Sequence, residues 1–566
     1  MKPVQILAHR LRGLLGATLL AAALPVAALT IVDLQPWRRN EEVPLRDAAG
    51  RGGRLVLTQL NPAANAWMLL TVQSPDSGRS FIYHLENADP ARQRVALDTD
   101  VPGRLLITGS SGSASCVLWP GTDLERAARS KLPYAPLCDA RLYLRNAVRG
   151  NRSTLEATTE FLRDHVWGGE RIVGFVKGEF YRDAFVEHAA SAPPSLLEPG
   201  GPAVAPPPAR LQAGVTPSAV LAEGLGIDLG PGGRALVPGL WYAAAGLEAV
   251  FVSVARPGEL APPVGHAAGL DAVESVALAY LVAFDLSAFD LGFELGTEHP
   301  RLGWSERVRS EVRDDRLPGP DGIDSAAPLV RTGMLAPPLL PRVIATFTAG
   351  FKREHGAFHS GALSAVNRGS HYGFIEQGVV FSTLQPGLAT LLVFDDGQVE
   401  MKTWSRGDEA RLATVRLARQ NGVPLLEPGP GGAAPVFGAL VDRWGAGNWS
   451  GSDDERFRTL RAGACLIENE GHRFLVYGYF SSATPRAMAH VFRAYDCRYA
   501  MHLDMNALEH TYLALYPGSG AQRGVEHLVP GMAVLDKSAG ATLLPRFLDF
   551  ADDRDFFYLL ARKGQR

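Results

Sequence analysis

Short apolar runs separated by turns fill the chain between residues 53 and 138. Four of these runs have the length of a strand, at 54–58, 66–71, 80–84 and 104–108. Strand-length runs bounded by turn residues at such spacing are typical of a small antiparallel sandwich. The pattern therefore predicts a β-sandwich-like domain at 45–140.

A helical spacing of apolar residues begins at Ser153. Ser153 and Glu156 have the spacing of a capping box, in which a hydroxyl and a carboxylate bond the first free amides of a helix. We therefore predict a helical segment at 141–190. The next stretch is rich in proline and almost uncharged, which is typical of an extended linker at 191–214.

The larger unit, at 215–536, alternates strand-like and helix-like patterns. Its predicted strands lie at 242–254, 276–286, 343–347 and 373–381, with a hairpin around an Asp-Gly turn at 389–402 and a helix at 408–421. We expect an α/β (α+β, mixed-sheet) C-terminal domain, preceded by the small β-sandwich and a helical spacer. Residues 537–566 are left as a C-terminal tail.

The sharpest local pattern lies at 473–506. A nearly continuous apolar run at 474–480 is typical of a strand covered on both faces. Thr484 suits the N-cap of a helix that starts with Pro485, and residues 499–504 alternate with the period of a strand. The segment predicts a strand–helix–strand unit, most simply a parallel crossover.

Such a unit predicts where a ligand would bind, because ligands lie beyond the carboxyl ends of the strands. Ser481, Ser482 and Thr484 are expected after the first strand, where free helix amides favour an anion. Asp504 and Asn506 follow the second strand. We therefore expect a phosphate-bearing ligand beside a carboxylate. The alternative is that the hydroxyls only cap a helix and that Asp504 only caps a turn.

Three motifs of the larger unit, at 349–356, 461–464 and 500–504, resemble the phosphodiester glycosidase family in order and spacing. The resemblance covers roughly residues 240–536. In that family a run of glycines and a serine normally follows the aspartate of the last motif. Here Met505 and Asn506 follow instead, so we expect the Asn506 side chain to contact the phosphate in their place.

The resemblance implies cleavage of a sugar–phosphate diester at the glycosidic carbon. Asp504 is then the acid/base or nucleophilic carboxylate, while Arg461 and Lys352 balance the phosphate charge. The candidate catalytic residues are Asp504, His502 and Glu468, and the candidate substrate-binding residues are Lys352, Arg461, Ser481, Ser482, Thr484, Asn506 and His510. The expected partner is a glycan or a sugar-phosphate substrate.

Two other functions stay open. One is a non-catalytic module that binds anionic glycans or a cell-envelope polymer. The other is a metal-dependent hydrolase, because several histidines and a glutamate of the larger unit make a divalent ion conceivable: His355, His359, His371, His502, Glu509 and His510. Ordinary hydrogen-bonding histidines explain the same residues, and no other cofactor is expected.

The start of the chain indicates export. Basic residues precede an uncharged stretch at 13–32, and Asp33 closes it. Twenty residues at about 1.5 Å each just span a bilayer core of about 30 Å, so we expect residues 1–33 to form a membrane anchor or a signal peptide cut after Ala28; a buried first helix is the alternative. We expect the remainder in the periplasm or on the extracellular face.

Charge and cysteines agree with this placement. With 56 basic against 59 acidic residues, the net charge is −3, which argues against a nucleic-acid partner. The four cysteines fall into two local pairs, Cys116 with Cys138 and Cys465 with Cys497. An exported chain can keep such pairs as disulfides; four buried thiols are the alternative.

Overall fold

The computed structural model describes most of the chain from residue 29 onward: 29–46, 51–74, 78–110, 112–119, 122–154, 203–231, 235–262, 269–306, 308–355, 371–443, 457–518 and 523–563, with a few single residues and pairs between them. Residues 1–28, where the anchor or signal peptide is predicted, and most of the predicted helical segment lie outside the described residues. In the described part, no helix has the length and hydropathy of a membrane span.

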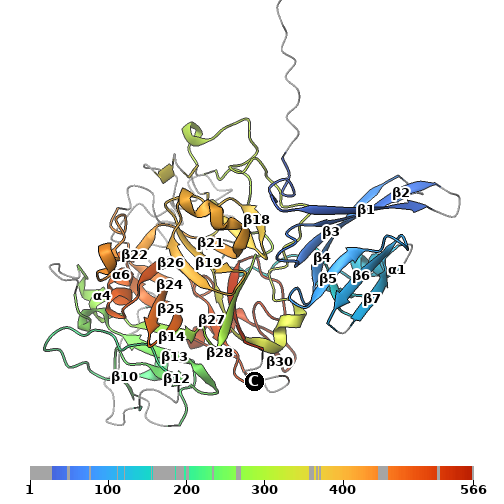
Figure 1. Ribbon diagram of the computed structural model, residues 1–566. Coiled ribbons are helices and arrows are strands. Elements are labelled where there is room, and N and C mark those ends of the chain that lie inside the picture. Colours follow the sequence, from blue (N-terminus) through green and yellow to red (C-terminus); the bar gives the residue numbers. More distant parts are fainter. Residues whose placement is uncertain are drawn as a thin grey trace, which may run out of the picture.

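The N-terminal unit consists of two antiparallel sheets beside the body of the molecule (Figure 1). The six-stranded sheet has the order β1 (Arg39–Arg46), β2 (Gly52–Gln59), β3 (Trp67–Gln73), β4 (Ser80–Asn87), β9 (Leu142–Arg145) and β8 (Tyr134–Leu137). The smaller sheet contains β5 (Gln93–Leu97), β6 (Arg104–Gly109) and β7 (Gly112–Val117), and α1 (Thr122–Ser130) follows it. All four strands predicted at 54–108 are confirmed.

Strand β3 packs on two cores at once, because successive side chains of a strand point to opposite faces. Met68 and Leu70 lie in the core that the two N-terminal sheets share. Trp67 and Leu69 lie instead in the core of the larger unit. The N-terminal unit is therefore joined to the larger unit through buried side chains.

The larger unit is built on an eight-stranded sheet and two five-stranded sheets. The eight-stranded order is β12 (Tyr242–Ala244), β13 (Leu247–Ala255), β14 (Ala279–Asp285), β25 (His472–Ala483), β24 (Thr459–Asn469), β26 (Tyr499–Met505), β22 (Pro424–Glu427) and β23 (Val436–Phe437). The second sheet has the order β15 (Phe289–Glu294), β31 (Phe556–Ala561), β16 (Val343–Thr348), β27 (Leu513–Leu515) and β28 (Glu526–His527). The third has β18 (Val379–Ser382), β17 (Phe374–Glu376), β21 (Val415–Gln420), β19 (Ala389–Phe394) and β20 (Val399–Thr403).

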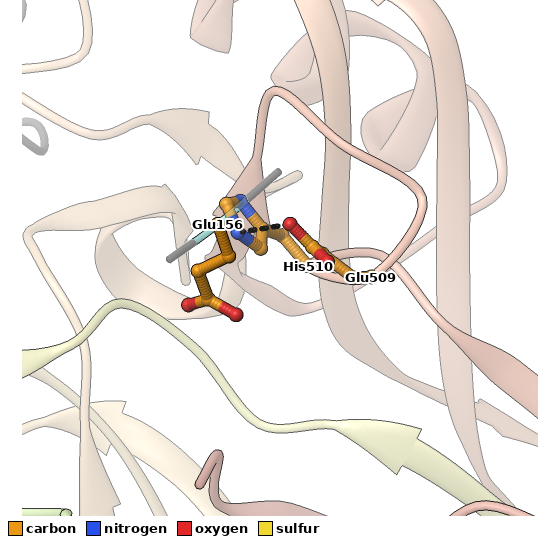
Figure 2. A group of neighbouring side chains, drawn as sticks. All are labelled: Glu156, Glu509 and His510. Atoms are coloured by element: carbon orange, nitrogen blue, oxygen red, sulfur yellow. Dashed lines mark ion pairs between the residues drawn. The ribbon is translucent and has the colours of Figure 1, made fainter. Parts of the chain in front are cut away.

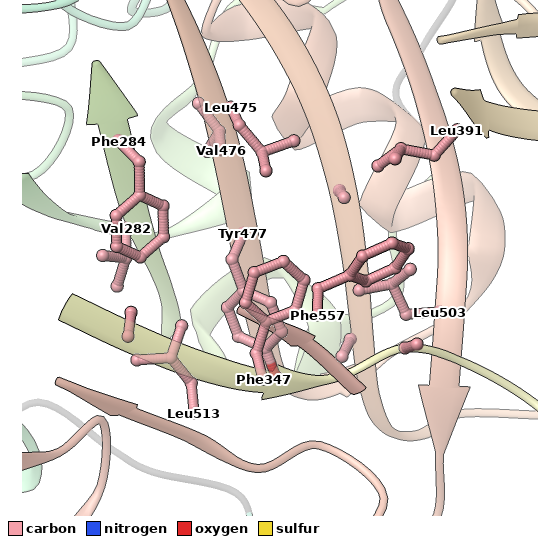
Figure 3. Close-up of a cluster of buried hydrophobic side chains, with 14 of the residues drawn as sticks. Val282, Phe284, Phe347, Leu391, Leu475, Val476, Tyr477, Leu503, Leu513 and Phe557 are labelled. Carbon is pink, nitrogen blue, oxygen red and sulfur yellow. The ribbon is translucent and has the colours of Figure 1, made fainter. Parts of the chain in front are cut away.

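The main core lies where these sheets meet (Figure 3). Tyr477 of β25 packs on Phe347 of β16, with ring centroids 5.3 Å apart, and Phe347 packs on Phe557 of β31 at 5.4 Å. Two two-stranded sheets complete the described strands: β10 (Val220–Leu221) with β11 (Ala235–Leu236), and β29 (Lys537–Ala539) with β30 (Thr542–Leu544). The segment 537–566 thus supplies β31, an inner strand of the second sheet.

The expected α/β class is wrong, because the described chain folds mostly into antiparallel sheets with few helices. β25 and β26 run in the same direction, but β24 lies between them and pairs antiparallel with both. The helix expected at 408–421 is also wrong: a 3-10 helix, Arg406–Thr414, is followed by strand β21. Both faces of β21 are largely buried between β17 and β19, and this packing outweighs the helical spacing.

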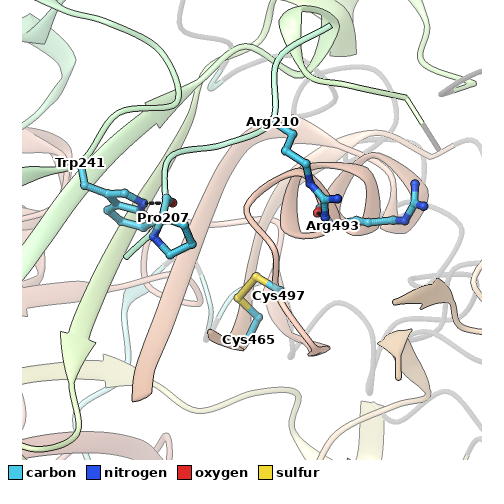
Figure 4. The surroundings of a disulfide bond; sticks show 6 residues. All are labelled: Pro207, Arg210, Trp241, Cys465, Arg493 and Cys497. Carbon is cyan, nitrogen blue, oxygen red and sulfur yellow. Dashed lines mark hydrogen bonds between the residues drawn. A yellow bond between two sulfur atoms is a disulfide. The ribbon is translucent and has the colours of Figure 1, made fainter. Parts of the chain in front are cut away.

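Helix α6 (Pro485–Ala494) confirms the predicted cap, since the Thr484 side chain accepts a hydrogen bond from the Ala487 amide. Both expected disulfides are present, Cys116–Cys138 and Cys465–Cys497. The second bond ties β24 to the turn after α6 (Figure 4). Beside it, the Trp241 indole donates to the Pro207 carbonyl at 2.9 Å, so the described end of the proline-rich stretch packs against the larger unit.

Candidate active site

Asp504 lies near the end of β26, a strand whose seven residues are all buried. Its Oδ2 accepts a hydrogen bond from Arg554 Nη1 at 2.6 Å, and its Oδ1 accepts one from the Met505 amide at 2.8 Å. Burial raises the pKa of Asp504 to about 6. A carboxyl with a pKa near 6 is protonated below that pH and keeps its proton in part at neutral pH, so it can act as a general acid.

Arg554 connects Asp504 to a second carboxylate. Its Nε and Nη2 donate to Glu156 Oε1 at 3.1 and 2.5 Å. Lys352 Nζ lies 2.9 Å from the same Glu156 oxygen and 2.8 Å from Asp553 Oδ2. Two cations from distant segments thus hold one buried carboxylate between them.

Glu156 is ionised in this position. Burial acts to raise its pKa, but Arg554 and Lys352 together hold that pKa well below its usual range. A position where a lysine and an arginine converge on one oxygen suits any small anion of charge −1, including a phosphate diester.

His510 packs on the other side of Arg554. Its Nε2 lies 2.8 Å from Arg554 Nη2, and its Nδ1 lies 2.7 Å from the Met505 carbonyl oxygen. The same Nε2 also lies 3.5 Å from Glu509 Oε1. His510 therefore lies between Arg554 and Glu509, beside Glu156.

One group of the described residues has ligand atoms close enough for a metal ion: Glu156, Glu509 and His510, within 4.8 Å of one another (Figure 2). The donor set does not fit a cation, because Arg554 and Lys352 already neutralise Glu156 and Arg554 Nη2 lies 2.8 Å from His510 Nε2. A divalent ion there would face two buried positive charges. Of the histidines considered for a metal, His359 lies outside the described residues.

Arg461 joins the ends of β25 and β26. It is fully buried, donates through Nε to the Ala483 carbonyl at 2.7 Å, and places Nη1 3.2 Å from His502 Nε2. Burial lowers the pKa of Arg461 to about 9, and burial followed by the charge of Arg461 lowers the pKa of His502 well below its usual range. His502 is therefore neutral and accepts from Arg461 in this state.

The start of α6 holds an anion of the protein itself. The Thr484 amide donates to Glu274 Oε1 at 2.7 Å, so a glutamate carboxylate fills the place expected for a phosphate. The expectation that Ser481 and Ser482 follow the strand is wrong, because β25 extends to Ala483. Ser481 Oγ donates to the Leu278 carbonyl at 2.8 Å within the sheet.

The other two predicted residues lie apart from each other. Asn506 follows β26 with a positive φ of 82°, and its Oδ1 accepts from Thr459 Oγ1 at 3.1 Å. Glu468 lies near the far end of β24, seven residues from Arg461, which is about 24 Å along a strand. It is half-exposed and pairs with Arg498 at 3.2 Å. The structure thus brings Asp504, Lys352 and His510 together, and leaves Glu468 at a distance.

The site is completed by three residues that no sequence motif identified: Arg554, Asp553 and Glu156. A usable signal exists for the first two: the charged run at 552–555 directly precedes the apolar run at 556–561. An apolar run of that length predicts a buried strand, which brings the charges before it to the edge of a sheet. Glu156 was predicted only to cap a helix.

Asn421 fixes the spacing between the two halves of the site. Its Nδ2 donates to the carbonyl oxygens of His502 and Leu503, both at 2.6 Å, directly before Asp504. Its Oδ1 accepts from the Phe351 amide at 3.1 Å, next to Lys352. One fully buried side chain therefore holds the Lys352 loop against β26.

A serine, a histidine and an aspartate also meet at the end of β18, but not as a nucleophilic triad. Ser382 Oγ and Asp321 Oδ1 both approach the same nitrogen of His371, Nε2, at 2.8 and 2.9 Å. Ser382 also donates to Asp321 directly, at 2.7 Å. A triad needs the acid and the hydroxyl on opposite nitrogens of the ring, so this cluster does not activate Ser382.

Comparisons with known proteins give little similarity. No family model and no curated protein matches the chain. Among solved structures, the catalytic domain of zebrafish N-acetylglucosamine-1-phosphodiester alpha-N-acetylglucosaminidase, auto-inhibited by its pro-peptide, matches 55% of this chain and 82% of its own at 11% identity and a TM-score of 0.29. A protein of Burkholderia pseudomallei described as exported matches 50% of this chain and 74% of its own at 12% identity and a TM-score of 0.19. At these TM-scores neither likeness adds to the geometry of the site.

Proposed function

We propose that this protein is an exported hydrolase that cleaves a phosphodiester-linked sugar at the glycosidic carbon. The observation that carries the proposal is Asp504: a buried carboxyl with a raised pKa, bonded to a guanidinium that itself holds an anion. The bond between the sugar carbon and the phosphate oxygen breaks as Asp504 gives its proton to that oxygen, and water bonds to the sugar carbon. The proton that the water loses passes to solvent, from which Asp504 is protonated again. Lys352 and Arg554 stabilise the charge on that phosphate.

The substrate takes the place of Glu156. A phosphate diester carries one negative charge, as the Glu156 carboxylate does, so the exchange leaves the charge balance around Lys352 and Arg554 unchanged. Both cations are then paired before and after binding, which avoids the large cost of a buried unpaired charge. The proposed substrate is a glycan or a cell-envelope polymer with sugar-phosphate linkages.

Two features support an exported location. Both pairs of cysteines form disulfides, which persist outside the reducing cytosol. The sequence also begins with basic residues followed by an apolar stretch, as exported chains do. We place the folded unit in the periplasm or on the outer face of the cell.

A second function, a non-catalytic module for anionic glycans, is favoured by one observation. The cations of the site are already neutralised by Glu156 and Asp553, and Asp504 is bound to Arg554. Such a closed set of ion pairs can exchange one anion for another without any chemistry.

The purified full chain, incubated with an aryl-sugar phosphodiester, tests both functions. The hydrolase reading expects release of free sugar and aryl phosphate, loss of turnover in Asp504→Asn, and no change in Asp496→Asn, a control at an exposed ion pair. Equal turnover in wild type and Asp504→Asn refutes the assignment. Binding without turnover, abolished by Lys352→Met, supports the binding module. Loss of activity with a chelator and rescue by a divalent ion would instead show metal dependence.

A further inference from the structure

Arg145 is a fully buried cation at the junction between the N-terminal unit and the larger unit. From β9 it reaches Glu86 of β4, with Nη1 2.5 Å from Oε2. Across the junction its Nη2 lies 2.6 Å from Glu294 Oε1 of β15 and 4.0 Å from Glu376 Oε1 of β17. One guanidinium thus faces three carboxyl groups, two of which belong to the larger unit.

Arg145 makes two further contacts at this junction. The guanidinium lies over the Trp67 ring, 4.4 Å from its centroid, and its Nε donates to the Val330 carbonyl at 3.0 Å. In the opposite direction, the Val330 amide donates to His84 Nδ1 at 2.9 Å. Arg145 and Val330 therefore lie together at the contact between the two units.

One oxygen of the Glu376 carboxyl lacks a hydrogen-bond donor in the described part of the chain. Its side chain is completely buried; Oε2 accepts from the Leu295 amide at 3.2 Å, while Oε1 has no hydrogen-bond donor among the described residues. Glu294 is already occupied by Arg145 and by the Thr332 hydroxyl at 2.9 Å. Burial, and next the adjacent charge of Glu294, raise the pKa of Glu376 well above its usual range.

Further titratable groups face this cluster from the surrounding elements. They are His84 on β4, Tyr134 on β8, Arg331 in the loop before β16, Arg416 on β21 and Tyr558 on β31. Arg331 is a further cation near Glu376, and it also faces Glu298 and Glu354. Burial lowers the pKa of His84 well below its usual range, so His84 adds no positive charge as the pH rises, while Arg331 keeps its charge and shares it among these three carboxyl groups.

We propose that Glu294 and Glu376 share one proton, and that this proton makes the Arg145 junction a pH-sensitive clamp between the two units. With the proton in place, Glu376 donates to Glu294 and Arg145 holds both units. Without it, two carboxylates face each other in a buried site with one shared guanidinium, and the junction loosens.

The direction of the pH effect follows from the folded-state pKa of Glu376 being raised. The clamp is complete below the ordinary glutamate pKa of about 4.3 and weakens as the pH rises toward the folded-state pKa. Over that window the open form gains about tenfold in population for each pH unit, because opening releases one proton.

Hydrogen exchange of the full chain tests this clamp. The reporter is the Val330 amide, whose bond to His84 crosses the junction, and wild type is compared with Glu376→Gln at each pH from 5 to 9. Comparison at equal pH cancels the intrinsic rise of exchange with pH. The ratio of wild-type to Glu376→Gln exchange should rise about tenfold per pH unit and level off at the folded-state pKa.

Two other variants make the result specific. Glu294→Gln should flatten the pH dependence in the same way, since either glutamine can supply the hydrogen bond that the shared proton supplies. Asp290→Asn, on the same strand but half-exposed and paired with Arg342, should follow wild type. The same pH dependence in wild type and in both glutamine variants refutes the shared proton, and so does faster exchange of Glu376→Gln at every pH.

Discussion

Asp504→Asn should stabilise the folded protein at neutral pH even though it removes a bond to Arg554. Burial raises the pKa of Asp504 from 3.8 to about 6, so the folded state disfavours the ionised form by about two pKa units. At about 1.4 kcal/mol per unit, the ionised carboxylate costs about 3 kcal/mol of folding free energy at pH 7. Asparagine keeps the shape without the charge, and Arg554 still bonds Glu156.

The sign of this effect depends on pH. Because the folded-state pKa is raised, the carboxyl's stability contribution is complete below pH 4 and is lost as the pH rises through about 6. Wild type and Asp504→Asn should therefore unfold alike at pH 3.5. At pH 7.5 the variant should be more stable by up to about 3 kcal/mol, the sign expected for a residue kept for function at a cost in stability.

Calorimetry at the two pH values measures this difference. With an unfolding entropy of about 2.1 cal/mol/K per residue and roughly 300 residues in the larger unit, 3 kcal/mol corresponds to roughly 4 to 5 °C in Tm. Asp496→Asn, at an exposed ion pair, should leave Tm unchanged at both values. A Tm for Asp504→Asn that is lower than wild type by the same amount at both pH values would show a structural ion pair, and would refute the proton-donor role.

If Asp504 acts as a protonated acid, turnover should fall about tenfold per pH unit above pH 6, and a rate that stays flat to pH 8 excludes it. Glu156→Gln should lower the KM for an anionic diester about tenfold, the scale of one charge-assisted hydrogen bond, with kcat unchanged. An unchanged KM, measured by initial rates, would show that the substrate does not displace Glu156. Replacing Cys465 and Cys497 with alanine should lower the free energy of unfolding in urea by about 3 to 4 kcal/mol, since the bond closes 32 residues of chain; the loss should vanish when wild type is measured reduced.

Local patterns predicted the elements of the larger unit better than their arrangement. The strand–helix–strand segment at 473–506 was placed correctly because its signals are local: a continuous apolar run, a Thr-Pro helix start and a period-two run. The predicted parallel crossover was wrong because β24 lies between β25 and β26. The tight turn at Glu470 and Gly471, both with positive φ, joins β24 to β25 and is the local signal that favours this antiparallel pair.

The candidate site was likewise predicted only as far as local sequence identifies its residues. Asp504 and Lys352 lie in motifs that a family resemblance identifies from local sequence. Arg554 lies 50 residues from Asp504 and 398 residues from Glu156. A charged run near the end of a chain is usually solvated, and only pairing with residues far away in sequence makes its burial favourable. No periodicity contains that information, so these partners could not be predicted from it.

The buried clusters around Arg554 and Arg145 are alike in charge but differ in what the arginine joins. Arg554 and Arg145 each face more than one carboxyl group, and burial raises the pKa of Asp504 in the first cluster and of Glu376 and Glu86 in the second. Glu376 is sealed at 0% exposure, so its proton can act only on its neighbours. The Asp504 side chain is 7% exposed. We assign chemistry to the first cluster because Lys352 and Arg554 converge there on one carboxylate oxygen beside Asp504. We assign domain contact to the second cluster because Arg145 joins carboxyl groups of both units.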